Sequence, residues 1–166
     1  MAKNPAVTYH PTNPRRSSRH LERVGLVVCC RDKHHGWWRA KDIYKSAPFK
    51  ERRLFAERCY NRWFILSAKH NLLDPEKVIR WYNLAMDNLT PAQRREWRQV
   101  VASQIRERFP DPRKVVFYFH AGLHYTVSLA RLLSEHHYKF KRPLRGMSQN
   151  RQQRWHREMN ARGACP

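Results

Sequence analysis

The sequence predicts an α/β fold: a single three-layer domain in which helices cover a mostly parallel central sheet. Short apolar runs rich in β-branched and aromatic residues alternate with longer segments whose apolar residues recur at helical spacing. Parallel strands need such crossover helices, and 166 residues with 41% hydrophobic content can bury one core. We therefore expect one domain with less regular segments at its ends.

The first segment, residues 1–23, contains prolines, a basic run and few apolar residues, which predicts a basic, flexible and largely disordered N-terminal arm. The α/β domain is expected over residues 24–147. Residues 148–166 are rich in Arg and Gln and contain Trp155, a composition typical of a basic C-terminal helix.

Within the domain, strands and helices are expected to alternate. The continuous apolar run after residue 23 indicates a strand covered on both faces. Pro48 begins a helix whose arginines, Arg52 among them, mark its solvent side, and Thr90-Pro-Ala-Gln93 is a capping box at the start of the next helix. The strands are predicted at about 24–29, 63–66, 114–119 and 138–141, and the helices at about 48–60, 90–109 and 127–137.

The charge of the chain indicates its partner. Lys and Arg number 34 against 13 Asp and Glu, a formal net charge of +21. Such a protein attracts polyanions and releases their counterions on binding, so we expect DNA, or alternatively RNA, as the partner. An anionic membrane surface is the rival interpretation. The chain has no long uncharged apolar run, so we expect no spanning helix, no secretory leader, no membrane partner and a cytoplasmic location.

The cysteine spacing predicts free thiols. It shows neither the paired pattern of zinc sites nor the density of a disulfide scaffold. Neighbouring cysteines on a strand point to opposite faces and rarely share one ion, so we expect neither a metal nor another cofactor. The four cysteines are Cys29, Cys30, Cys59 and Cys165.

Polar residues gather where the predicted strands end. Ligands of open α/β sheets bind at the carboxyl edge, where the loops after parallel strands converge. A thiol, hydroxyls, lysines and imidazoles supplied by independent strand ends make a candidate site. The four segments are Cys29 to Lys33, Ser67 to His70, His120 to Tyr125, and Arg145-Gly146.

Five motifs carry a resemblance to a known family. They are Ile65-Leu-Ser-Ala68, Cys29-Cys-Arg-Asp-Lys33, Ala40-Lys-Asp-Ile-Tyr44-Lys-Ser46, His120-Ala-Gly-Leu-His-Tyr125 and Pro143-Leu-Arg-Gly-Met147. Together they resemble the YaaA-like family, in particular the small uncharacterised relatives of the peroxide-stress protein YaaA. The resemblance covers about residues 24–151. Asn71 stands where the family commonly has Gly, and Asn tolerates the left-handed conformation, so the turn is expected to survive.

The YaaA-like fold is distantly similar to the uracil-DNA glycosylase architecture, which implies a function. There, a carboxylate or water-positioning loop follows the first strand and a histidine loop follows a late strand. Asp32 and His120 occupy those places, although no Gly-Gln-Asp-Pro-Tyr motif is present. The resemblance implies that His120 or His124 stabilises a departing base anion and that Asp32 or Asp42 positions water.

We therefore expect a DNA-binding protein that acts on nucleobases, in the first place a DNA glycosylase in DNA repair or in defence against modified foreign DNA. The candidate catalytic residues are Asp32, Asp42, Ser67, His120 and Cys29. The candidate nucleic-acid-binding residues are Lys33, Tyr44, Ser46, Lys69, His70, Tyr82, His124, Tyr125, Arg145, Arg15 and Arg16.

Alternatives stay open for the function and for single residues. The Cys-x-x-x-Lys and Tyr-x-Ser series resembles a motif of archaeosine synthase, which adds an amine to a modified tRNA base; Cys29 would then be a nucleophile whose pKa Lys33 lowers. A non-enzymatic DNA-binding or protection protein needs charge alone. Structurally, Ser67 can cap a turn, His120 can be a hydrogen-bonded core histidine, and Tyr82 can be a packing group.

Overall fold

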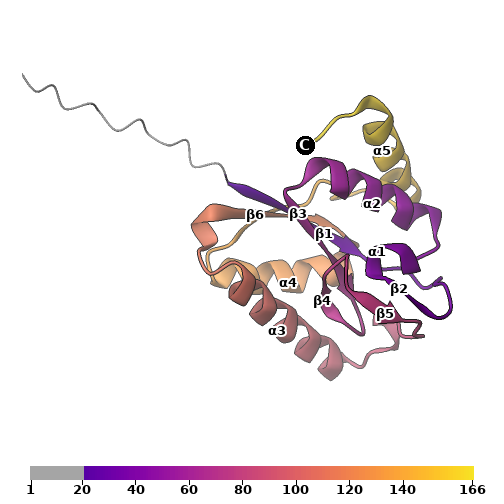
Figure 1. The fold of residues 1–166 in the computed structure, drawn as a ribbon. Coiled ribbons are helices and arrows are strands. Elements are labelled where there is room, and N and C mark those ends of the chain that lie inside the picture. Colours follow the sequence, from indigo (N-terminus) through magenta and orange to yellow (C-terminus); the bar gives the residue numbers. More distant parts are fainter. Residues whose placement is uncertain (1–20) are drawn as a thin grey trace, which may run out of the picture.

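The computed structural model describes residues 21–166 and is built on a five-stranded sheet with the order β4-β3-β1-β6-β7 (Figure 1). Four of its strands run parallel, and β4 pairs antiparallel with β3. The predicted α/β fold with a mostly parallel sheet is therefore confirmed. The strands are β1 (Glu22–Val28), β3 (Arg62–Ser67), β4 (Asn71–Leu73), β6 (Val115–His120) and β7 (Lys139–Lys141).

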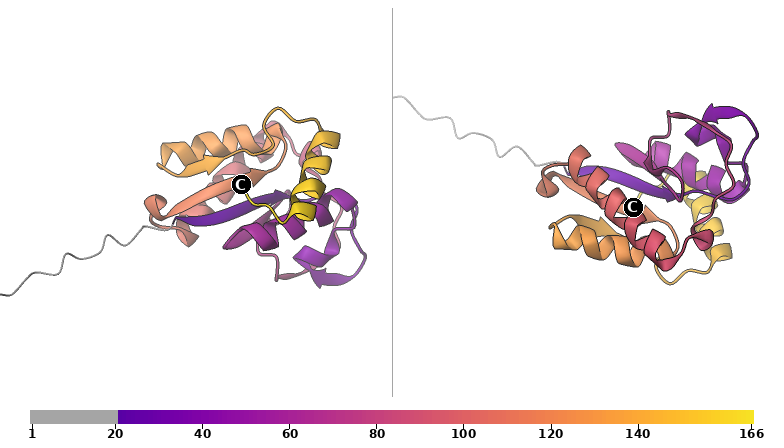
Figure 2. Two further views of the ribbon diagram at one scale, coloured as in Figure 1. Left: turned by 90° about the horizontal axis from the view of Figure 1, so that it is seen from above. Right: turned by 90° about the horizontal axis from the view of Figure 1, so that it is seen from below.

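Helices cover both faces of the sheet (Figures 1 and 2). On one face lie α1 (Ala40–Ile43), α2 (Ala47–Cys59) and α5 (Gln149–Arg162); on the other lie α3 (Pro91–Arg108) and α4 (Leu123–Glu135). Each face has its own apolar core, because successive β1 residues point to opposite sides: Leu26 packs in the core under α3 and α4, and Val27 in the core under α2. This burial on both sides explains the continuous apolar run in the sequence.

Gly25 on β1 allows a close approach that a larger residue would prevent. A Cβ atom built there would overlap Tyr60 Cδ2 and lie 2.9 Å from Tyr60 Cε2 and 3.3 Å from Trp63 Cβ. The Tyr60 ring cannot easily move aside, because it is buried and its hydroxyl is bonded to His120. The pairing of β1 with β3 therefore depends on glycine at this position.

We predict that Gly25→Ala lowers the free energy of unfolding by about 1–3 kcal/mol, the usual cost of overpacking a core. Urea denaturation monitored by circular dichroism measures the change. Gly122→Ala is the control, because a Cβ atom at Gly122 would meet no atom within 4 Å. A similar small loss in both variants would contradict the steric account.

Two local predictions are confirmed. The Thr90 side chain accepts a hydrogen bond from Gln93 N (3.2 Å), the Gln93 side chain accepts one from Thr90 N (2.8 Å), and α3 begins at Pro91. Asn71 adopts the left-handed conformation, with φ of 57°.

The sequence did not indicate a second sheet, formed by β2 (Trp37–Arg39) and β5 (Val78–Arg80) in antiparallel pairing. Both strands have three residues, too few to show an alternating pattern. Two short 3₁₀ helices, η1 (Met86–Asn88) and η2 (Pro112–Lys114), complete the fold.

The two ends of the described part, residues 21–166, meet beside α2. Strand β1 begins at Glu22, and the Arg23 side chain bonds the carbonyl oxygen of Pro166. A disulfide joins Cys59 at the end of α2 to Cys165, although 106 positions separate them in the sequence. The prediction of four free thiols is therefore wrong for this pair, because the return of α5 onto α2 brings distant residues together; Cys29 and Cys30 are free.

Within residues 21–166, no helix is long and apolar enough to cross a bilayer. The predicted arm, with Arg15 and Arg16, lies outside the described residues apart from its last three positions.

Candidate functional site

A pocket of about 520 Å³ opens at the carboxyl edge of the sheet, where the sequence predicted a site. Val28 and Cys29 line it at the end of β1, and Gly122 lines it in the loop that follows β6. Its other walls come from α2, α4 and α5 and from Asp87 of η1. The helix α5 contributes four amide side chains, Gln149, Asn150, Gln152 and Gln153.

Three helices begin at this pocket. The N-cap of α2 is Ser46 and the N-cap of α4 is Gly122, both of which line the pocket, and Gln149 there is the first residue of α5. The first turn of a helix carries unpaired N–H groups and a partial positive charge. Gly122 has no side chain to accept from the N–H groups of α4, so this helix start is the least satisfied of the three. The convergence favours an anionic ligand.

Arg52, on α2, lines the same pocket. Its Nε is buried and has no hydrogen-bond partner among the described residues. Burial lowers the pKa of Arg52 from its ordinary value, yet a guanidinium stays charged at neutral pH. A buried N–H group without an acceptor is unfavourable. Arg52 is therefore a candidate for contact with the anionic part of a ligand.

Cys29 is half-buried in the pocket wall, with the Tyr125 hydroxyl beside its thiol. Burial raises the pKa of Cys29, and the hydrogen bond from the Ala68 backbone and the charge of Lys33 only partly oppose this effect. The thiol is therefore protonated at neutral pH, which disfavours a nucleophilic role in this state.

Ser67, Tyr44 and Tyr82 form a buried hydrogen-bonded network behind the pocket. The Tyr82 hydroxyl lies 2.8 Å from both Ser67 Oγ and the Tyr44 hydroxyl. Ser67 Oγ also accepts from His70 N at 3.1 Å, so it caps the turn after β3. These three side chains are almost completely buried and have no access to a ligand in this structure.

Lys33 extends the same network. It is buried, its Nζ donates to the Arg31 carbonyl oxygen at 3.0 Å, and it lies 4.2 Å from the centre of the Tyr82 ring. Burial lowers the pKa of Lys33. The motifs that resemble the YaaA-like family thus link the loops after β1 and β3. This link holds Cys29 in the wall of the pocket.

His120 and His156 form a buried chain whose hydrogens can be assigned. His156 Nδ1 lies 2.8 Å from the Gln152 carbonyl oxygen, which only accepts, so His156 Nδ1 carries a proton. In the neutral ring, His156 Nε2 then accepts from His120 Nδ1 at 3.0 Å, and His120 Nε2 accepts from the Tyr60 hydroxyl at 2.5 Å.

Burial lowers the pKa of both histidines, that of His156 to about 4. His120 is fully buried behind His156, which itself lines the pocket. The structure therefore favours the core alternative for His120, and its ring does not face a ligand.

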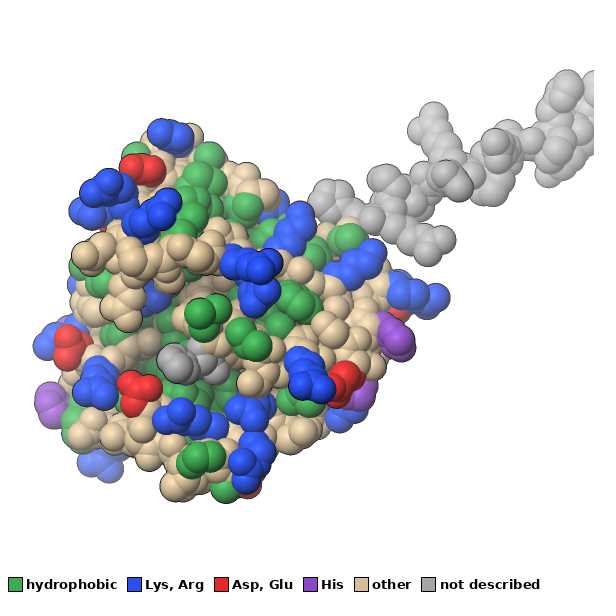
Figure 3. All heavy atoms as spheres, turned by 180° about the vertical axis from the view of Figure 1, so that it is seen from behind, with side chains coloured by type: hydrophobic (Ala, Val, Ile, Leu, Met, Phe, Trp, Pro, Cys, Tyr) green, Lys and Arg blue, Asp and Glu red, His purple; other side chains and the backbone are tan. Residues whose placement is uncertain are grey.

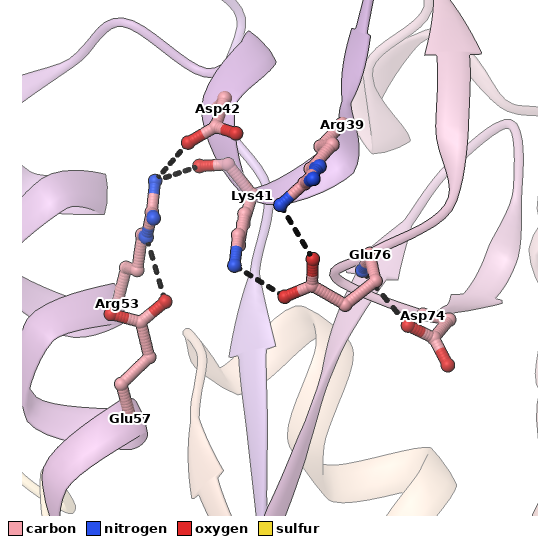
Figure 4. Close-up of polar contacts among 7 residues, drawn as sticks. All are labelled: Arg39, Lys41, Asp42, Arg53, Glu57, Asp74 and Glu76. Carbon is pink, nitrogen blue, oxygen red and sulfur yellow. Dashed lines mark hydrogen bonds and ion pairs between the residues drawn. The ribbon is translucent and has the colours of Figure 1, made fainter.

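Asp42 lies in an ion-pair network outside the pocket (Figure 4). Its carboxylate is 2.6 Å from Arg53, whose guanidinium is also 2.9 Å from Glu57. Beside it, Lys41 and Arg39 both pair with Glu76. The Asp42 carboxylate is thus engaged with Arg53 and is not free to position water in the pocket.

The remaining predicted site residues are scattered around the edge. Asp32 and Lys69 have exposed side chains in the loops after β1 and β3. His70 packs edge-on against Tyr82, and burial lowers its pKa. Arg145 lines a neighbouring cavity of about 260 Å³ that shares Gly122 with the pocket. His124 lies in the first turn of α4, and its side chain is outside the described part.

Sequence reasoning missed three groups of the pocket. Arg52 was assigned to the solvent side of α2, Asp87 was not considered, and α5 was placed outside the domain, so its amides and His156 were not expected. The Gln-rich composition of 149–153 was the available signal. Among residues 21–166, no three His, Cys, Asp or Glu side chains gather as a metal site.

Fold and pocket define a three-layer α/β protein with a pocket at the carboxyl edge of its sheet. The chain belongs to DUF6884, a family of unknown function, whose model matches residues 24–158 and so includes every lining residue of the pocket. No curated protein and no solved structure matches the chain.

Proposed function

We propose that this protein binds nucleic acid and accepts one extruded nucleotide in the pocket at the carboxyl edge of the sheet. The observation that carries the proposal is Arg52, which lines a pocket where three helices begin and whose buried Nε has no hydrogen-bond partner among residues 21–166. Charge-assisted hydrogen bonds to phosphate oxygens would satisfy Arg52, and the free N–H groups of α4 would add to them.

The size and lining of the pocket suit a nucleotide. Its volume of about 520 Å³ falls within the common range for small-ligand sites. Gln and Asn side chains carry both a donor and an acceptor, as the edges of bases require. The four amides of α5 therefore supply base contacts at one side of the pocket, while Arg52 supplies the phosphate contact at another.

The surface of the protein supports a polyanionic partner. Figure 3 shows a face on which Lys and Arg side chains are spread widely and acidic side chains are few. The whole chain carries 34 Lys and Arg against 13 Asp and Glu. These exposed cations would hold the phosphate backbone without reading its sequence, and the pocket would take the single nucleotide.

The reaction we propose is hydrolysis of the N-glycosidic bond of the extruded nucleotide. Asp87 is the acidic residue among those that line the pocket. Its side chain is exposed and lies 3.9 Å from Arg31. A general base must reach the attacking water, which Asp87 can do from the pocket wall and Asp42 cannot. In this proposal Asp87 takes the role that the glycosylase resemblance assigned to Asp32 or Asp42.

Cys29 distinguishes this proposal from the second enzymatic candidate. Its thiol lines the pocket, as an amine-adding or covalent enzyme would require, but burial keeps it protonated. We therefore place Cys29 as a wall residue. Mass spectrometry of DNA and tRNA incubated with the protein separates the candidates: a released base that disappears in Asp87→Asn supports hydrolysis, whereas a protein–base adduct that disappears in Cys29→Ser contradicts it.

The Arg52 contact is tested with a panel of nucleoside monophosphates in calorimetric titrations. Because a charge-assisted hydrogen bond typically contributes 1.5–3 kcal/mol, we expect Arg52→Gln to weaken nucleotide binding by roughly 10- to 100-fold. Arg131→Gln is the matched control: it removes the same charge from α4, where Arg131 is exposed and pairs only with Glu135 within the described residues. Equal losses in the two variants would show that net charge, not the pocket, binds the nucleotide.

A further inference from the structure

The sheet formed by β2 and β5 presents large aromatic side chains to solvent. Trp37 is 68% exposed, the most exposed large hydrophobic residue of the described part, and Val78, which stands opposite Arg39, is 57% exposed. In Figure 1 this sheet lies at the end of the molecule towards which β1 points, apart from the central sheet. We call it the tryptophan ribbon (residues 37–39 and 78–80).

The pairing of β2 with β5 explains which side chains of the ribbon point to solvent. Directly opposite residues in an antiparallel pair point to the same face. Trp38 stands opposite Ile79, which is buried in the core under α2, so this pair lies on the inner face, where Trp38 is still 42% exposed. Trp37 stands opposite Arg80, and both are turned outward.

Trp37 also differs from the other tryptophans nearby, because each of those has a ring partner. Trp38 packs on His34 with ring centres 4.8 Å apart, and Trp81 stacks on His35 at 4.7 Å. Within residues 21–166, no aromatic ring pairs with Trp37. The Trp37 indole therefore has a face open to solvent, on which a planar group can stack.

Hydrogen bonds hold the ribbon in place, and the ribbon carries an exposed cation. Trp81 N donates to the Gly36 carbonyl oxygen at 2.9 Å, and Trp38 Nε1 donates to the His35 carbonyl oxygen at 2.8 Å. These two hydrogen bonds fix the backbone at the start of β2 and at the end of β5. Arg80 is exposed beside Trp37, whereas the nearby carboxylate of Glu76 is paired with Arg39 and Lys41. The outward face therefore combines an indole with a positive charge.

We propose that Trp37 is a stacking platform for an unpaired base of single-stranded nucleic acid, with Arg80 on the adjoining phosphate. Stacking on an aromatic side chain beside a cation is the usual way in which proteins bind single strands without reading their sequence. The loop that joins β1 to the ribbon starts at Cys29 and Cys30, which line the pocket. The platform rests on the nucleic-acid binding of the proposed function, but not on the pocket.

The test compares a labelled oligothymidylate with a flush-ended hairpin duplex in fluorescence anisotropy at one salt concentration. We expect Trp37→Ala to weaken binding of the single strand by roughly 5- to 100-fold and to leave duplex binding unchanged, because a duplex offers no unpaired base. Trp37→Phe should retain most of the affinity, since it keeps a ring. Leu54→Ala, which removes a 53% exposed apolar side chain from α2, should have no effect on either probe.

Other outcomes assign the surface to a different partner. Unchanged single-strand binding by Trp37→Ala, or equal losses for both probes, overturns the platform while the proposed function stands. A Trp37-dependent dimer in light scattering, or Trp37-dependent binding to anionic vesicles without an effect on the single strand, also overturns it. If the unmodified protein binds neither nucleic-acid probe, the proposed function itself fails.

Discussion

Lowering the pH from 7 to 4 is expected to reduce the free energy of unfolding by about 3 kcal/mol through His156 alone, with a further loss from His120. In the folded protein the pKa of His156 is about 4, because burial disfavours its charged form, whereas the unfolded chain has the ordinary value of 6.5. Between these two values the unfolded state binds more protons, so stability falls as the pH falls. Well above pH 6.5 both states are neutral and the contribution is constant.

Urea denaturation at a series of pH values between 7 and 4 measures this loss. His156→Gln should show a shallower dependence on pH, because Gln can still accept from His120 but does not titrate. His136→Gln is the control, since His136 is an exposed histidine at the end of α4. A profile that is flat for the unmodified protein, or equally steep in His156→Gln, would show that the buried pair is not neutral in the folded state.

Nucleic-acid affinity is expected to fall by roughly 10³- to 10⁵-fold between about 50 and 200 mM salt, which corresponds to about six to ten phosphate contacts. The formal charge of +21 provides enough cations for such contacts. Fluorescence anisotropy with a labelled duplex measures the slope of log affinity against log salt. An affinity that does not depend on salt would contradict electrostatic binding by this protein.

Removal of residues 1–20 tests how much of that slope the N-terminal segment supplies. Strand β1 begins at Glu22, so this deletion leaves the sheet intact. The segment contains Lys3, Arg15, Arg16 and Arg19. If all four contact phosphates of duplex DNA, the slope should decrease by roughly 3 to 4, whereas an unchanged slope would place the contacts on the folded domain.

The elements that depend on local sequence could be predicted before the structure. The apolar runs predicted the parallel strands, Thr90 and Gln93 predicted the start of α3, and Asn71 predicted the left-handed turn. Each of these depends on neighbouring residues or on a simple period, so the physical cause is visible in the sequence. Because parallel strands end at one edge, the location of the pocket followed from the same pattern.

The roles of individual residues at that edge depended on burial, which the sequence does not show. Ser67 and His120 stand directly at strand ends, as catalytic residues often do, yet both are fully buried and bonded to Tyr82 and Tyr60. Asp42 is held by Arg53. A strand end brings a residue to the edge, but the packing of the loops decides whether its side chain faces the pocket.

Thus the sequence by itself determined the fold class, the edge that carries the pocket and the cationic character of the protein, because these follow from composition and from local periodicity. Only the tertiary structure decided that α5 folds back over α2. That contact brings Cys165 to Cys59, His156 to His120, and the amides of α5 to Arg52. The residues of α5 lie about a hundred positions from the residues of α2 that they contact, so no pattern within a short window of sequence reveals the contact. The free energy that stabilises it comes from side chains that meet only in the folded chain.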